Sequence, residues 1–146
     1  MNKLITIIFP LILSFIVTFL FSCNFNNEIP KPKFQPPSYV FSIVWSFIYL
    51  CFGYYLHITN GIKDTKLKNQ ILMVWFVNLL LNLYWSPLFT CEKQYKQAFF
   101  IMIALLFSNY VLYTLGPSKE AKLCMTPYIV WLHVALMLNA DIINKT

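Results

Sequence analysis

Charged residues are scarce in this 146-residue chain, at 11% of the total, whereas hydrophobic residues make up 59%. Mean hydropathy is +0.63. A water-soluble domain usually has about 25% charged residues, because most of its surface faces water. The composition therefore excludes an ordinary soluble protein and favours an integral membrane protein of single-domain length.

Arginine is absent, and all eleven basic residues are lysine, for a net charge of +6. The lysines stand at the ends of the apolar runs and avoid their middles. This placement is typical of residues that anchor helices at the two membrane surfaces. No basic helix face or continuous lysine patch is present, so we expect no nucleic acid partner.

Sequence patterns for chemistry are also missing. The long apolar runs contain no Asp, Glu, Lys or Arg, although ion-coupled transport usually needs such groups inside the membrane. The four cysteines form no C-x-x-C pair and no metal-ligand spacing with either histidine. No nucleophile–base pair or phosphate-binding loop is found. We therefore predict no catalytic residue, no metal site and no obligatory cofactor.

Five charge-free runs of about 20 residues divide the chain. Each is long enough to cross about 30 Å of hydrocarbon as a helix, and the alternating strands of a membrane barrel are absent. The sequence predicts one all-α membrane domain over residues 1–146, a five-transmembrane-helix bundle. Its helices are expected at approximately 4–23, 37–58, 69–89, 96–115 and 123–142.

The first run also has features of a signal peptide. It is longer than a typical signal-peptide core and lacks an A-x-A cleavage site. We therefore expect a mature helix, kinked at Pro10. Six lysines fall on one side of this topology and five on the other, so neither orientation nor the particular membrane is predicted.

A proline-rich basic segment joins the first two predicted helices. Each of its prolines fixes φ and disfavours helix at the residue before it, which predicts a stiff connector over residues 24–36. It is either a structured loop at the helix entrance or a lid over a binding site. The lid candidates are Lys31, Pro32, Lys33, Phe34, Pro36 and Pro37.

Aromatic and amide side chains recur at helical spacing in the second, third and fifth predicted helices. The second carries an aromatic stripe, with Gly53 placed to allow close approach of a neighbouring helix. In the third, Asn78 and Asn82 are four residues apart. Amides are costly towards lipid, so both should face the bundle, either as interhelical hydrogen bonds or as ligand contacts.

The two histidines are weaker candidates. His133 lies about 200° around its helix from Trp131, which favours a packing or dimer-face role over ligation of haem iron. His57, near a helix end, is expected at the membrane interface.

Three motifs occur in order: K-P-K-F-Q-P-P followed by Trp45, Tyr49 and Gly53; N-L-Y-W-S-P-L-F at 82–89; and P-Y-I-V-W-L-H-V-A-L-M-L-N at 127–139. Together they resemble the translocator protein, or tryptophan-rich sensory protein (TspO/MBR), family. The resemblance implies a five-helix bundle in the lipid bilayer, commonly a homodimer. It also implies a pocket in one half of the membrane, beneath the first interhelical loop, that takes porphyrin, haem or sterol ligands.

Carried over position by position, the resemblance gives nine ligand-binding candidates. They are Trp45, Tyr49, Asn78, Asn82, Trp85, Trp131, Ala135, Leu138 and Asn139.

In the expected binding mode, a flat macrocycle lies between the faces of the three tryptophans in this set. The asparagines orient its polar edge, and Lys31 and Lys33 pair with its carboxylates. Ala140 stands where the family's sterol-recognition stretch has a tyrosine, so porphyrin binding is better supported than sterol binding. The alternatives are a membrane adaptor with a vestigial ligand site, and light-dependent porphyrin degradation.

Overall fold

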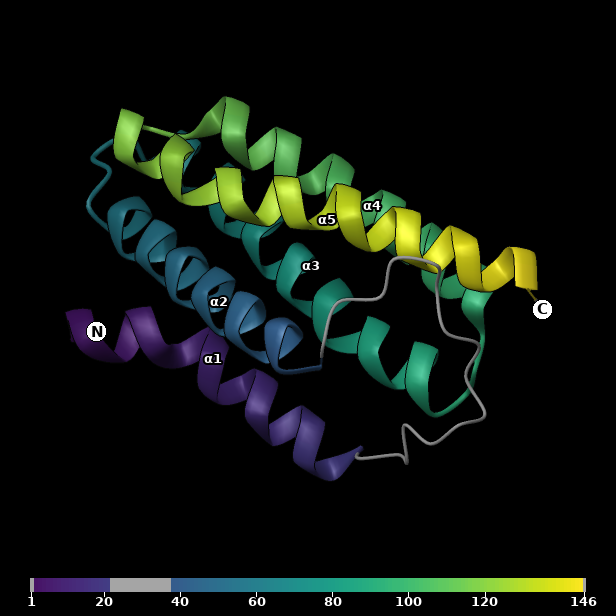
Figure 1. Cartoon of the computed structure of the whole chain (residues 1–146). Coiled ribbons are helices and arrows are strands. Elements are labelled where there is room, and N and C mark those ends of the chain that lie inside the picture. The colour runs from purple at the N-terminus through teal and green to yellow at the C-terminus, as the bar shows by residue number, and fades with distance from the viewer. Residues whose placement is uncertain (1, 22–37, 146) are drawn as a thin grey trace.

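The computed structural model describes residues 2–21 and 38–145, and these form five helices (Figure 1). They are α1 (Lys3–Leu20), α2 (Ser38–Asn60), α3 (Thr65–Thr90), α4 (Tyr95–Leu115) and α5 (Lys119–Lys145). All five are long and apolar enough to cross a membrane. The predicted all-α, five-span integral membrane protein is confirmed.

The third and fifth helices begin four residues earlier than expected, because their first turns include lysines that the charge-free windows had left outside. At the start of α3, the Asp64 carboxylate accepts hydrogen bonds from the backbone N–H groups of Lys66 and Leu67. This cap satisfies donors that would otherwise lack a partner. The charged end of the helix therefore continues beyond the hydrocarbon.

Helix packing gives a ring in the order α1, α2, α5, α4, α3, with α3 also in contact with α1 and α2. The start of α1 and the end of α5 lie at opposite ends of the bundle (Figure 1). Large apolar side chains such as Phe19, Phe107 and Leu123 are exposed. In a bilayer these outer faces contact lipid, so their exposure has no hydrophobic cost.

Gly53 sets the contact between α1 and α2. A Cβ built at this position would lie 1.9 Å from the backbone oxygen of Ile7, so only glycine permits this approach. The close helix contact predicted from the spacing of Gly53 is confirmed. Elsewhere α1 is loosely packed, and among its described residues only Thr6 and Pro10 are buried.

The half of the bundle that contains the end of α2 and the end of α4 is densely packed. Trp75 of α3 stacks on Phe52 of α2, with ring centroids 4.4 Å apart, and its indole N–H donates to the Phe52 carbonyl (3.1 Å). The Tyr55 hydroxyl donates to the Leu112 carbonyl of α4 (2.7 Å). The cavity described below lies in the opposite half.

Candidate functional site

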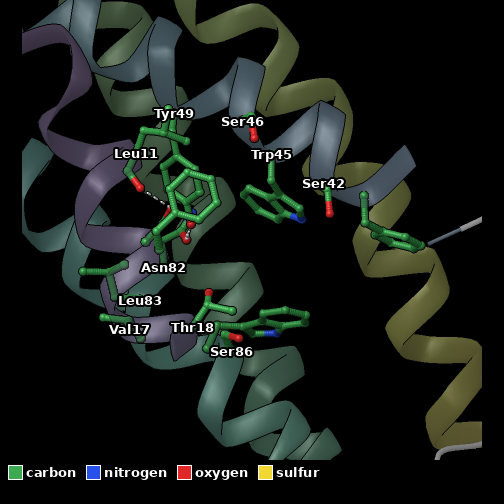
Figure 2. A pocket seen from close by; sticks show the side chains of 14 residues that line it. Leu11, Val17, Thr18, Ser42, Trp45, Ser46, Tyr49, Asn82, Leu83 and Ser86 are labelled. Carbon is green, nitrogen blue, oxygen red and sulfur yellow. Dashed lines mark hydrogen bonds between the residues drawn. The ribbon is translucent and has the colours of Figure 1, made fainter. Parts of the chain in front are cut away.

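A cavity of about 240 Å³ lies between α1, α2 and α3 (Figure 2). Its lining combines aromatic rings, aliphatic side chains, hydroxyl groups and one amide. The lining residues are Leu11, Ser14, Phe15, Val17, Thr18, Phe41, Ser42, Trp45, Ser46, Tyr49, Asn82, Leu83, Trp85 and Ser86.

The position of the cavity follows from the α1–α2 contact. The two backbones touch where Gly53 meets Ile7, and the cavity lies further along, beside the second half of α1 and the first half of α2. The chain leaves the described part at Phe21 and returns at Ser38, both at this end. The predicted lid, residues 24–36, lies outside the described residues.

Stacked and edge-on aromatic contacts form the wall. Trp45 packs tilted against Tyr49 (5.8 Å between ring centroids) and edge-on to Tyr128 (6.1 Å). On α3, Trp85 stacks on Phe89 at 4.8 Å. These contacts restrict the indole rotamers, so the cavity has pre-formed apolar surfaces.

Two indole N–H groups near the cavity are buried without a hydrogen-bond partner among the described residues, those of Trp85 and Trp131. Trp85 lines the cavity. Trp131 of α5 makes an edge-on contact, at 5.5 Å, with Phe41, which is part of the lining. Buried donors in proteins are nearly always satisfied, so these two are candidates to bind acceptor groups of an occupant.

A chain of hydrogen bonds runs from the cavity into the bundle. The Tyr49 hydroxyl donates to Asn82 Oδ1 (2.5 Å), as Figure 2 shows, and Asn82 Nδ2 donates to the Tyr128 hydroxyl (2.5 Å). Tyr128 donates to Asn78 Oδ1 (2.9 Å), and Asn78 Nδ2 donates to Ser108 Oγ (2.7 Å). The chain links α2, α3, α5 and α4, and both asparagines face the bundle as predicted.

The structure places four of the nine predicted ligand residues in the cavity lining: Trp45, Tyr49, Asn82 and Trp85. The other five are buried beyond the lining: Asn78, Trp131, Ala135, Leu138 and Asn139.

Asn139 illustrates the difference between the two groups, since its Nδ2 donates to the Tyr95 carbonyl on α4 (3.0 Å). Helical phasing correctly indicated that α5 turns this face inward, but it does not say which neighbour the face meets. A ligand role for all nine residues stays a prediction.

The α1 wall of the cavity was not predicted from the sequence. Ser14 and Thr18 are four residues apart on an otherwise apolar helix and both line the cavity. Ser42 and Ser46 repeat this spacing on α2. The sequence pattern that could have indicated this wall is a pair of small hydroxyl residues at i and i+4 within an apolar run. Such a pair indicates a helix face that contacts protein or a cavity as well as lipid.

His133 lies on the exposed side of α5, where its Nε2 is 2.9 Å from the Tyr110 hydroxyl of α4. This contact agrees with the packing role favoured from its helical phase, and the alternative dimer-face role stays a prediction. In the described part of the chain, no group of three or more His, Cys, Asp or Glu side chains is arranged to hold a metal ion.

Residues 6–144 match the profile of the TspO/MBR family. The chain is 33% identical to the tryptophan-rich protein TspO of Chlorobaculum tepidum over 124 residues, which cover 82% of this chain and 78% of the relative. Protein CrtK of Rhodobacter capsulatus is 24% identical over 119 residues, covering 80% and 74%. The translocator protein of Ovis aries is 26% identical over 116 residues, covering 77% and 69%. The chain therefore belongs to the TspO/MBR family.

Proposed function

We propose that this protein is an intramembrane receptor for tetrapyrroles that holds the edge of a flat macrocycle in the cavity between α1, α2 and α3. The observation that carries the proposal is the aromatic wall formed by Phe41, Trp45 and Trp85, beside a buried indole N–H that lacks a partner. Stacking on such surfaces contributes about 0.5–1.5 kcal/mol per pair beyond area burial.

The size of the cavity decides how such a ligand is held. Pockets that enclose a drug-sized ligand usually measure about 300–1,000 Å³, and this cavity measures about 240 Å³. Phe15, Thr18 and Ser42 line it and are exposed, so the cavity opens at the surface of the bundle. One edge of a macrocycle is therefore inserted, and the remainder extends into the surrounding lipid.

Polar groups of the lining then select the inserted edge. The Trp85 indole N–H is a donor suited to a carbonyl or carboxylate oxygen, and the hydroxyls of Ser42 and Ser46 can adapt to either partner. Sterol binding has less support, because its expected recognition tyrosine is replaced by Ala140. The binding site has the composition of a receptor, apolar with a few polar groups.

The test is saturable binding of protoporphyrin IX to the protein in lipid nanodiscs, followed by porphyrin fluorescence, with empty nanodiscs as the background. Trp45→Leu keeps an apolar side chain but removes the stacking surface, and the dissociation constant is expected to rise about three- to tenfold. Trp75→Phe is the matched control, since Trp75 is fully buried against Phe52 and does not line the cavity.

Equal affinity of the Trp45 variant and the unaltered protein would move the site away from this cavity. Binding no greater than that of empty nanodiscs would reject the receptor function and favour the adaptor alternative.

A further inference from the structure

The hydrogen-bond chain that begins at the cavity has a fixed direction, and a backbone carbonyl sets it. At the inner end, the Ser108 hydroxyl donates to the Leu105 carbonyl on its own helix (2.8 Å). A carbonyl oxygen can only accept. The serine proton is therefore used, and its oxygen must accept from Asn78 Nδ2 at 2.7 Å.

The direction of the Ser108 hydrogen bond fixes the direction of each following hydrogen bond, from Ser108 to the cavity. Asn78 Nδ2 also lies 3.3 Å from Asn109 Oδ1, so both amide hydrogens of Asn78 meet acceptors on α4 and its Oδ1 must face Tyr128. The Tyr128 hydroxyl donates a hydrogen bond to Asn78 Oδ1, and the oxygen of the same hydroxyl accepts one from Asn82 Nδ2. Asn82 Oδ1 therefore faces Tyr49 and accepts a hydrogen bond from the Tyr49 hydroxyl.

Reversing the chain would require Ser108 to give up the Leu105 carbonyl and the side-chain amides of Asn78, Asn82 and Asn109 to flip. A buried polar group left without a partner costs more than an average hydrogen bond gains, and linked bonds in a low-dielectric interior strengthen one another. At the cavity end, the Tyr49 hydroxyl is consequently already a donor to Asn82 Oδ1, and towards an occupant of the cavity it can only accept a hydrogen bond.

From this polarity we infer that Tyr49 is a specificity residue, which selects tetrapyrroles that carry an O–H or N–H donor on the inserted edge. The inference rests on the receptor function proposed above. A ligand with an ether or carbonyl oxygen at the same place would set two acceptors against each other, and that repulsion discriminates against it.

Two porphyrins that differ in one group type test the inference: haematoporphyrin, which has peripheral hydroxyls, and its bis-methyl ether, in which those hydroxyls are methylated. Both are titrated against the unaltered protein in nanodiscs, with empty nanodiscs as background. We expect the hydroxyl form to bind about three- to tenfold more tightly, as one additional hydrogen bond provides.

Three variants then locate the preference. Tyr49→Phe removes the acceptor but keeps the ring, and Ser108→Ala removes the anchor while leaving every cavity-lining residue in place. Both are expected to reduce the ratio of the two dissociation constants to about one. Ser108→Thr keeps a hydroxyl that can donate to the preceding turn, and it should retain the preference of the unaltered protein.

The outcomes separate the two proposals. Equal binding of the two porphyrins to the unaltered protein, or a preference that survives in Tyr49→Phe, overturns this inference and leaves the receptor function standing. Binding of neither porphyrin above the empty-nanodisc background overturns both. Loss of the preference in Ser108→Ala through tighter binding of the ether supports a role for the chain that simple packing does not explain, because a Tyr49 hydroxyl released from its fixed direction can donate to the ether oxygen.

Discussion

At the scale of single residues, Tyr55 shows how a buried hydroxyl ends a helix. Near the end of α4, the Gly116 N–H donates to the Tyr113 carbonyl. The Tyr55 hydroxyl donates to the Leu112 carbonyl one residue earlier. Tyr55→Phe should therefore lower the free energy of unfolding by about 1–3 kcal/mol, since a buried acceptor loses its partner. Thermal unfolding in detergent, followed by circular dichroism, measures the change. Tyr39→Phe is the control, because Tyr39 is 65% exposed; equal midpoints for the two variants would contradict the prediction.

At the scale of helices, the Gly53 contact holds α1 on the bundle. Gly53→Ala would place a methyl group on the Ile7 carbonyl, so α1 must move away. The expected cost is about 1–3 kcal/mol of stability, as for other overpacked sites, together with weaker porphyrin binding because α1 forms one wall of the cavity. Gly61→Ala is the matched control, since a Cβ added at Gly61 would lie 3.4 Å from its nearest neighbour, the backbone oxygen of Ile58, which is an ordinary contact distance. An unchanged unfolding midpoint for Gly53→Ala would show that α1 is not held there.

At the scale of the whole molecule, five spans place the lysines on two faces of the membrane. Lys66 and Lys119 stand at the starts of α3 and α5, whereas Lys96 stands at the start of α4, on the opposite face. In sealed vesicles with one orientation, a membrane-impermeant amine reagent should modify either the first two or Lys96. Mass spectrometry of the digested protein reads the pattern, and detergent-permeabilised vesicles give the full set. Equal modification of Lys66 and Lys96 in sealed vesicles would refute the topology.

The sequence predicted some of these features and not others, for physical reasons that differ between charge, helical period and helix contacts. Charge-free runs predicted the spans, because burying a charge in hydrocarbon is costly, but they misplaced the starts of α3 and α5. The 3.6-residue period correctly turned Asn78 and Asn82 inward. It did not indicate that Tyr128 joins them, since a period fixes the face of a helix and not its depth or its neighbour. The α1 wall was missed for a related reason: the spacing of Gly53 predicted the close approach of a neighbouring helix, but not that this helix is α1.

The sparse packing of α1 has a consequence for how the protein meets its ligand. Phe15 is 60% exposed on the outside of this helix and also lines the cavity, so hydrocarbon and binding site are separated by a single side chain. If the protein is the pigment receptor proposed above, a pigment dissolved among the acyl chains can enter the cavity sideways, without passing through water. Occupancy should then follow the mole fraction of pigment per lipid. Doubling the lipid at constant pigment should dilute the complex even when the aqueous volume does not change.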